Sequence, residues 1–388
     1  MNANSNDFQP LTIAAYAEQA LTTDQRSDGA SLTFPLLGLF GETGSLLSAV
    51  KKKQRDRASY AGYAEAVVEE FGDVLWYVTT VAARGGLRLE DIMAAALPVR
   101  SGDTPEHISA LQPAVMQLGA EPTAAFEDTL LRLAGEVGVL LIDHGQGRLS
   151  DRRTLHDRLV TITRGLIQTA TEAGVTLEAA AVKNLAKIFD RWPRVRVYPD
   201  ALDAEAEWVE QLPRSLSVDI YEREVRGQTY VFQRCQGLNI GDRLTDNAME
   251  ADDYRFHDVF HFANLAVLTW SPVLRSLLRL KRKSDPRIDE AQDGARAIIV
   301  EEGVTNWIFG QAAKLDFFAG MKPGSLSFDL LKQVRQLVAG YEAERCPLWV
   351  WEDAILQGCA AFRYLRQHRR GRLNIDMANR RLSIEALP

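Results

Sequence analysis

Apolar residues recur along most of the chain at the i, i+3, i+4 spacing of an amphipathic helix. The pattern predicts long helices over 66–83 and 155–174, and a further helix over 295–313. Strand-like alternation of apolar and polar residues is scarce, and 228–233 is its best example. The sequence therefore predicts a mainly α protein, in which 228–233 forms either one short β-hairpin or no strand.

One helical phrase occurs twice. Residues 36–47 read LLGLFGETGSLL and residues 130–141 read LLRLAGEVGVLL, so both fit the frame L-L-x-L-x-G-E-x-G-x-L-L. Each copy is followed by a predicted loop, a long helix, a turn and another helix, and the turns at 86–90 and 174–178 align. A stretch with three prolines, 101–122, is expected to link the copies. We expect two related helical units packed as an internal pseudo-dimer.

Three segments are expected. Residues 1–100 form the first repeat unit, 101–197 form the second, and 198–388 form a helical C-terminal domain. The predicted helix 295–313 echoes 64–82. The C-terminal domain is therefore either a distant third unit or an unrelated helical domain.

Charge and composition narrow the function classes. The 388 residues carry a net charge of -7, which disfavours nucleic-acid binding. Basic runs at 51–53, 280–285 and 366–372 could each meet a phosphate group or form a solvated face. The three cysteines lie far apart, which indicates neither a disulfide framework nor a zinc knuckle. No signal-peptide pattern or long apolar stretch occurs, so we expect a soluble cytoplasmic protein without membrane contact.

Acidic residues lie within apolar helical stretches of the first unit. Glu70 and Asp73 are three residues apart and share a helix face, with Glu69 beside them. Glu42 lies in the preceding helix beside glycine. Carboxylates amid apolar neighbours are costly to bury unless they are paired or bind metal. Oxygen ligands on two helices suit Mg²⁺, whereas E-x-x-D alone is also typical of a solvated helix face.

Residues 36–97 resemble the all-α nucleoside triphosphate pyrophosphohydrolases, the MazG-like superfamily. That family has G-E-x-G-E on one helix, a basic loop, E-x-x-D on the next helix, and then a helix with Asn, Lys and Arg. Glu42 matches the first glutamate, and Glu70 and Asp73 match the acidic pair. Ser45 stands in place of the second glutamate and removes one ligand charge, which Glu69 or Glu65 could supply.

The resemblance implies a catalytic site for a nucleoside triphosphate. A (d)NTP would be cleaved to the monophosphate and pyrophosphate with Mg²⁺, or alternatively Mn²⁺. The implied metal ligands are Glu42, Glu69, Glu70 and Asp73, of which Glu42, Glu70 and Asp73 are also the implied catalytic residues. Lys51, Lys52 and Lys53 are the implied phosphate-binding residues of this unit.

The second unit matches a different part of the family pattern. Arg158 and Thr161 stand where the first unit has Glu70 and Asp73, which argues against a second Mg²⁺ site. Its last helix instead carries Asn184, Lys187 and Arg191, which match the family's substrate-binding helix. We therefore expect one composite active site, although cations are also common at an ordinary helix C-terminus. The alternative function is a nucleotide sensor with weak turnover. Because members of the family commonly form dimers, the resemblance also leaves a homodimer open.

The C-terminal region also looks like the domain that accompanies some MazG-like domains. His257 and His261 lie one helical turn apart, with Asp258 beside them. Glu301 or Glu302 could complete a second metal or nucleotide site. The alternative is a module for partner binding or oligomerisation.

Overall fold

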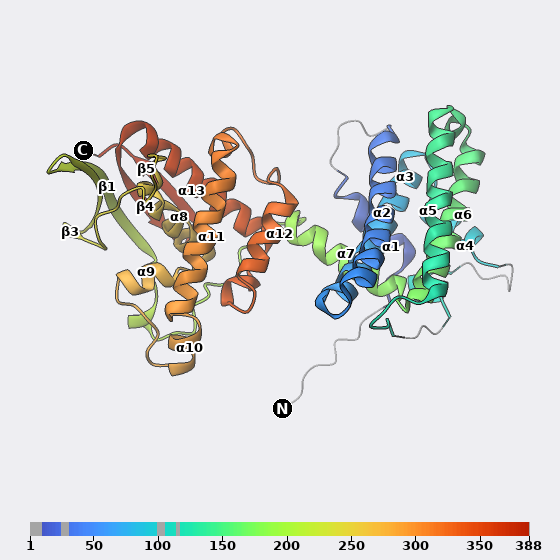
Figure 1. Ribbon diagram of the computed structural model, residues 1–388, viewed down its shortest axis with the longest axis horizontal. Coiled ribbons are helices and arrows are strands. Elements are labelled where there is room, and N and C mark those ends of the chain that lie inside the picture. Colours follow the sequence, from blue (N-terminus) through green and yellow to red (C-terminus); the bar gives the residue numbers. More distant parts are fainter. Residues whose placement is uncertain (1–9, 25–30, 99–104, 114–116, 388) are drawn as a thin grey trace. The chain divides into compact units, whose positions relative to one another are not determined.

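The computed structural model describes residues 10–24, 31–98, 105–113 and 117–387 (Figure 1). The chain divides into two compact units, Met1–Phe189 and Asp190–Pro388. Part of the predicted linker 101–122 and all of the N-terminal segment 1–9 lie outside the described residues. None of the helices in the described ranges is both long enough and apolar enough to cross a membrane.

The described part of the first unit is helical. Its α-helices are α1 (Ile13–Leu21), α2 (Thr33–Asp56), α3 (Tyr63–Arg84), α4 (Leu89–Ala96), α5 (Ala124–Gly145), α6 (Arg152–Ala173) and α7 (Leu177–Arg191). Apolar residues spaced for one helix face are buried between them, and Phe71 packs near Phe126 with ring centroids 6.2 Å apart. This arrangement confirms the predicted mainly α fold of the unit.

The repeated phrase corresponds to two similar pairs of helices. Helix α2 packs on α3, α5 packs on α6, and the pairs meet where α2 contacts α5 and α3 contacts α6. Each pair ends in a tight turn and a further helix, α4 or α7, and the turn glycines Gly86 and Gly174 both have positive φ. The periodicity of the two copies therefore corresponds to the same succession of elements in each.

The second unit contains an antiparallel sheet in addition to helices. The strands are β1 (Ser215–Val225), β2 (Gln228–Cys235), β3 (Leu238–Asn239), β4 (Arg370–Asp376) and β5 (Arg381–Glu385). Their order is β3-β2-β1-β4-β5. Strands β1 and β2 form the predicted hairpin, joined by Arg226 and Gly227, which both have positive φ as such a tight turn requires.

The sheet is larger than the sequence predicted. In β1 the buried residues Leu216, Val218 and Ile220 alternate with polar ones, and β4 pairs with β1 from the far end of the chain. The basic run 366–372 therefore ends within a strand. Two of its cations pair with acids, since Arg369 lies 2.5 Å from Glu222 and Arg372 lies 2.6 Å from Asp219.

Helices cover the sheet and enclose the core of the second unit. They are α8 (Asp258–Ala263), a π-helical turn (Asn264–Leu268), α9 (Pro272–Leu277), α10 (Pro286–Ala291), α11 (Ala295–Ala313), α12 (Phe328–Leu337) and α13 (Leu348–His368). Helix α13 packs on α8, β4 and β5. Residues 256–275 are all buried, so α8 lies inside the unit rather than on its surface.

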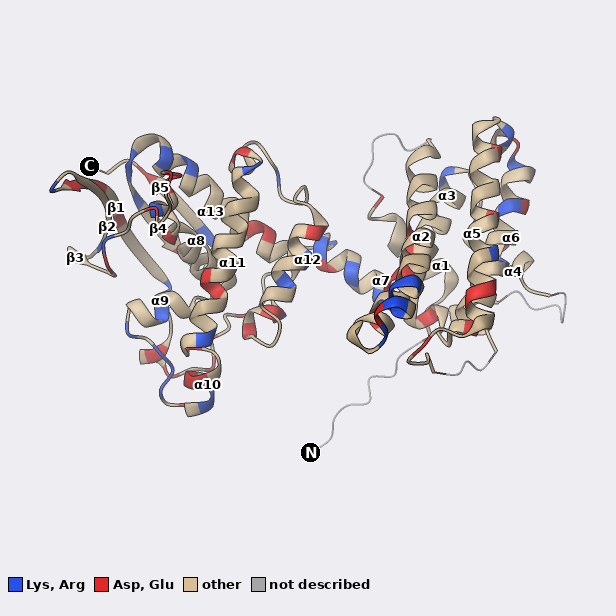
Figure 2. Cartoon of the chain, in the orientation of Figure 1, with Lys and Arg blue, Asp and Glu red and all other residues tan. Residues whose placement is uncertain are grey.

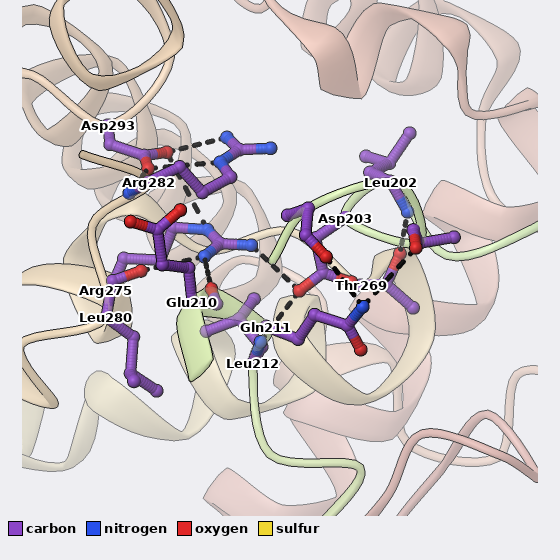
Figure 3. A network of polar contacts seen from close by, with 12 residues as sticks. Leu202, Asp203, Glu210, Gln211, Leu212, Thr269, Arg275, Leu280, Arg282 and Asp293 are labelled. Atoms are coloured by element: carbon purple, nitrogen blue, oxygen red, sulfur yellow. Dashed lines mark hydrogen bonds and ion pairs between the residues drawn. The ribbon is translucent and has the colours of Figure 1, made fainter. Parts of the chain in front are cut away.

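A buried network of ion pairs joins the segments around α9 (Figure 3). Arg275 Nη2 donates to Asp203 over 2.8 Å, and Arg282 Nη2 donates to Asp293 over 2.6 Å. Arg282 also donates to Glu342 over 2.9 Å. Arg282, in the basic run 280–285, is thus a buried structural cation with its own carboxylates, not a phosphate-binding side chain.

Cations and anions are interspersed in each unit (Figure 2).

Candidate functional site

Three carboxylates of the first unit converge between α2 and α3. Glu42 lies on α2, and Glu70 and Asp73 lie one turn apart on α3. Each offers an oxygen, and these oxygens all lie within 4.8 Å of one another. All three residues are partly exposed, so the cluster is open to solvent. Packing of α2 on α3 therefore brings together the acids of two separate sequence motifs.

The cluster has the properties of a cation site. Oε2 of Glu70 is buried and has no hydrogen-bond partner in the described part of the chain. Burial, a hydrogen bond with Glu42 and the charges of Glu42, Asp73 and Glu69 raise the pKa of Glu70 to about 8. Burial also raises the pKa of Asp73, although Lys187 opposes the shift. An all-oxygen donor set with excess negative charge fits Mg²⁺ or Mn²⁺.

Helix α7 of the second repeat supplies polar groups to this cluster. Asn184 Nδ2 donates to Asp73 Oδ1 over 2.9 Å, and Lys187 forms an ion pair with Asp73 Oδ2. The ammonium group of Lys187 also lies 3.4 Å from Glu69 Oε1. Glu69 is therefore paired with a cation at the edge of the cluster. Tyr16 on α1 completes the set with a 3.3 Å hydrogen bond to Asn184 Oδ1.

A glycine makes this approach of α7 possible. A Cβ atom at Gly72 would lie 2.6 Å from the carbonyl oxygen of Ala180 and 2.9 Å from Cβ of Asn184. The backbones of α3 and α7 therefore cross at a distance that excludes any side chain at position 72. Because Asp73 follows Gly72 directly, the close crossing places Asn184 against its carboxylate.

The other predicted phosphate-binding residues are engaged or distant. The predicted basic loop is helical, because α2 continues to Asp56. Lys51 and Lys52 are exposed nine and ten residues after Glu42, which is roughly 14 Å along a helix axis. Lys53 is buried, and its Nζ donates to Arg57 O over 2.8 Å. The structure does not bring this basic run to the acid cluster.

Arg191 makes its contacts within the second compact unit. Its Nη2 donates to Leu326 O over 2.6 Å, and its guanidinium lies over the rings of Trp192 and Phe328 at 4.1 and 5.6 Å. Helical spacing alone placed Arg191 on the same face as Asn184 and Lys187. In the structure its guanidinium is held by other partners.

The equivalent positions of the second repeat carry different chemistry. Glu136, the counterpart of Glu42, is half-buried on α5. Arg158, the counterpart of Glu70, pairs with Asp143 at 2.6 Å, and Thr161 donates to the carbonyl of Asp157 over 3.0 Å. The second repeat therefore has a cation and a satisfied hydroxyl where the first has two carboxylates.

The candidate residues of the C-terminal domain also lie together. His257, His261 and Glu302 offer ligand atoms within 4.8 Å of one another. Asp258 Oδ1 lies 3.0 Å from His257 Nε2, and Glu301 Oε1 lies 3.0 Å from His261 Nδ1. The helix spacing of the histidines and the Glu-Glu pair were the sequence signals for this cluster.

Two residues that contribute to these clusters belong to no motif recognisable in the sequence. Tyr16 precedes the first repeated phrase, and Gln233, which donates to Asp258 Oδ2, lies in a strand. Each is isolated in the sequence from the motif that it serves. Only the packing of α1 on α3, and of β2 beside the start of α8, brings them to their partners.

Comparison with known protein families covers the C-terminal half of the chain. Residues 197–388 match the family model of the MazG C-terminal domain. Neither a curated protein nor a solved structure shows detectable similarity to the chain. The predicted resemblance to MazG-like proteins is confirmed through this domain: residues 197–388 are a MazG C-terminal domain, which is consistent with a MazG-like protein.

Proposed function

We propose that the chain is a Mg²⁺-dependent nucleotide pyrophosphohydrolase that cleaves a (d)NTP to the monophosphate and pyrophosphate. The observation that carries the proposal is the convergence of Glu42, Glu70 and Asp73, with their oxygens within 4.8 Å. The MazG C-terminal domain supports it, because it associates the chain with MazG-like proteins. The site would be composite, with acids from the first repeat and Asn184 and Lys187 from the second.

Each group has a role that follows from its surroundings. Glu42, Glu70 and Asp73 would hold the ion, which when bound neutralises phosphate charge and acidifies a water molecule. Asn184 holds the carboxylate of Asp73 in one orientation through its 2.9 Å hydrogen bond. Lys187 is the cation nearest to the acids and would stabilise negative charge on the departing pyrophosphate.

A nucleotide sensor with weak turnover is the second candidate, and two observations favour it. Ser45 lies on α2 where the family has a ligand glutamate, so the site has one anionic oxygen donor fewer. Arg191 is held by Leu326 and two aromatic rings instead of facing a phosphate. The missing ligand would lower the rate of the chemical step, and the engagement of Arg191 removes one cation from the transition state.

Pyrophosphate release from a panel of NTPs and dNTPs with Mg²⁺ tests the proposal. Glu42→Gln and Glu70→Gln should each lower the rate at least about 100-fold, as expected when a residue acts in a concerted site. Glu136→Gln is the matched control, because Glu136 occupies the position of Glu42 in the second repeat. Its rate should equal that of the wild type.

The remaining outcomes separate the two candidates. Mg²⁺-dependent nucleotide binding without pyrophosphate release would reject the enzyme and leave the sensor. Absence of both binding and release would reject both candidates. Equal losses in Glu42→Gln and Glu136→Gln would show that the acid cluster is not the site.

A further inference from the structure

The buried histidines of the second unit lie at the junction of three elements. His257 directly precedes α8, and His261 follows one turn later within the helix. Glu301 and Glu302 project from α11, which packs on α8. Gln233 on β2 donates to Asp258. None of these groups belongs to the acid cluster of the first unit.

The hydrogen bond of His257 determines which ring nitrogen can bind a ligand. Nδ1 lies 2.9 Å from the carbonyl oxygen of Tyr254, which can only accept, so Nδ1 carries a hydrogen. In the neutral imidazole, Nε2 then has the free lone pair. That atom faces Asp258 Oδ1 at 3.0 Å and Glu302 Oε2 at 3.8 Å. The ring of Tyr254 stacks on the imidazole at 4.3 Å and fixes its plane.

His261 is fully buried, and neither of its ring nitrogens has a hydrogen bond within the described residues. Nδ1 lies 3.0 Å from Glu301 Oε1, within ion-pair distance but off the line of a hydrogen bond. Nε2 lies 3.5 Å from Glu302 Oε2, the same oxygen that His257 faces. An imidazole buried without hydrogen bonds is costly, which indicates a missing partner for its nitrogens.

Glu301 is a supporting residue rather than a ligand. Its carboxylate is fully buried and accepts from Asn264, Ser271 and the backbone N–H of Val273 at 2.9 to 3.2 Å. These bonds orient Oε1 toward His261 Nδ1. A carboxylate beside one ring nitrogen of a histidine is the usual outer arrangement of a metal-binding imidazole, and here that contact is an ion-pair distance of 3.0 Å and not an aligned hydrogen bond.

We propose that His257 Nε2, His261 Nε2 and Glu302 Oε2 bind a transition-metal dication, with Asp258 as an adjoining carboxylate. Two imidazole nitrogens with carboxylates suit Zn²⁺, Mn²⁺ or Fe²⁺, whereas Mg²⁺ prefers oxygen ligands alone. Glu302 is 41% exposed at its side chain, so the ion would enter and meet solvent on that side. Three protein ligands with a solvent-facing side are typical of a metal that also binds a water or substrate oxygen.

The same groups could instead form a metal-free ion-pair cluster. Burial alone would lower the pKa of His261, but Glu301 and Glu302 raise it well above its ordinary value. A proton on Nε2 and a metal ion are therefore competitors for one position. The experiment must distinguish a bound metal from an imidazolium.

The full-length protein, stripped of metal with a chelator, would be titrated with Zn²⁺ in the presence of excess Mg²⁺. Excess Mg²⁺ occupies oxygen-only sites, so we expect one Zn²⁺ equivalent per chain. Glu302→Gln should weaken Zn²⁺ binding at least about tenfold. Even residues that only hydrogen-bond to a metal ligand contribute about 10- to 100-fold to metal affinity. The Glu70→Gln variant should still bind one equivalent of Zn²⁺ per chain.

His156→Gln is the matched control, because His156 also lies beside a carboxylate, Asp157, but on the exposed surface of α6. It should bind Zn²⁺ as the wild type does. X-ray absorption of the Zn²⁺-loaded wild type requires no variant and should show two imidazole nitrogens around the ion.

Three results would overturn the proposal. They are no Zn²⁺ equivalent under excess Mg²⁺, an equivalent lost in Glu70→Gln but kept in Glu302→Gln, and an all-oxygen coordination shell. None of these readouts depends on pyrophosphate release, so the failure of the proposed enzyme activity would leave this site unaffected.

Discussion

The side-chain amide of Asn184 donates to the carboxylate of Asp73, with 2.9 Å between Nδ2 and Oδ1. This bond joins the last helix of the second repeat to the acidic helix of the first. The two residues are 111 positions apart in the sequence. The two repeats therefore carry different functional groups: at this contact the first contributes carboxylates, and the second contributes an amide and an ammonium group.

Replacement of Asn184 should destabilise the metal-free protein. Asn184→Leu removes the donor to Asp73, which keeps only its ion pair with Lys187, and leaves the buried hydroxyl of Tyr16 without its acceptor. We expect a loss of about 1–3 kcal/mol in the free energy of unfolding, measured with urea in a chelator. Asn184→Asp should lose more, because it places a second carboxylate against Asp73. Mg²⁺ should restore part of that loss, and equal stability of all three proteins would contradict this account.

The close crossing at Gly72 predicts a position-specific effect of one added methyl group. Gly72→Ala forces Cβ to within 2.6 Å of a backbone oxygen, so α7 must move away from α3. The expected loss is about 1–3 kcal/mol of unfolding free energy. Gly44→Ala is the control, since Gly44 is a helical glycine with no atom within 4 Å of its added Cβ. It should be neutral or stabilise by up to about 1 kcal/mol. Similar changes in both variants would argue against the crossing.

The raised pKa of Glu70 predicts a pH dependence of stability without metal. The unfolded carboxyl titrates near 4.5 and the folded one near 8, so between these values the folded state holds a proton that the unfolded chain has released. The free energy of unfolding should therefore fall as pH rises through this window. Glu70→Gln should reduce the slope, because it removes the titrating group.

Mg²⁺ provides the complementary measurement. The ion competes with the proton on the acid cluster, so Mg²⁺ should raise the thermal unfolding temperature more at pH 8 than at pH 6. A shift that is equal at both values would indicate that Glu70 is not a ligand.

The buried ion pairs around Arg275 should contribute far more to the free energy of unfolding than ion pairs on the surface do. Asp203 accepts from Arg275 over 2.8 Å and from Arg214 over 2.6 Å, and Asp203→Ala leaves Arg275 buried without this partner. We expect a loss of about 3–5 kcal/mol in chemical unfolding of the second unit. Asp219→Asn breaks the partly exposed cross-strand pair with Arg372 and should cost far less, because solvent screens this pair. Comparable losses would mean that the network in Figure 3 contributes little.

Local sequence patterns were sufficient to predict the helices but not to predict the sheet. Helix periodicity over 66–83 and 155–174 is visible in the sequence because the buried face repeats within each segment. Strand β1 pairs with β4, which begins at Arg370, and the latter reads in the sequence as part of a basic run. Within β4, Arg372 donates to Asp219, its partner residue on β1, and Arg369, directly before the strand, donates to Glu222.

The sequence by itself determined the helical class of the first unit, the two repeats, the likeness to MazG-like proteins and the residues with suitable chemistry. All of these features depend only on the order of neighbouring residues and on the type of each side chain. Tertiary structure decided which of those residues meet. It places Lys187 on Asp73 and gives Arg191 other partners, although both lie one turn apart on α7. Periodicity assigns a residue to a helix face, whereas contact depends on close crossings such as the one at Gly72, which involve segments far apart in the sequence.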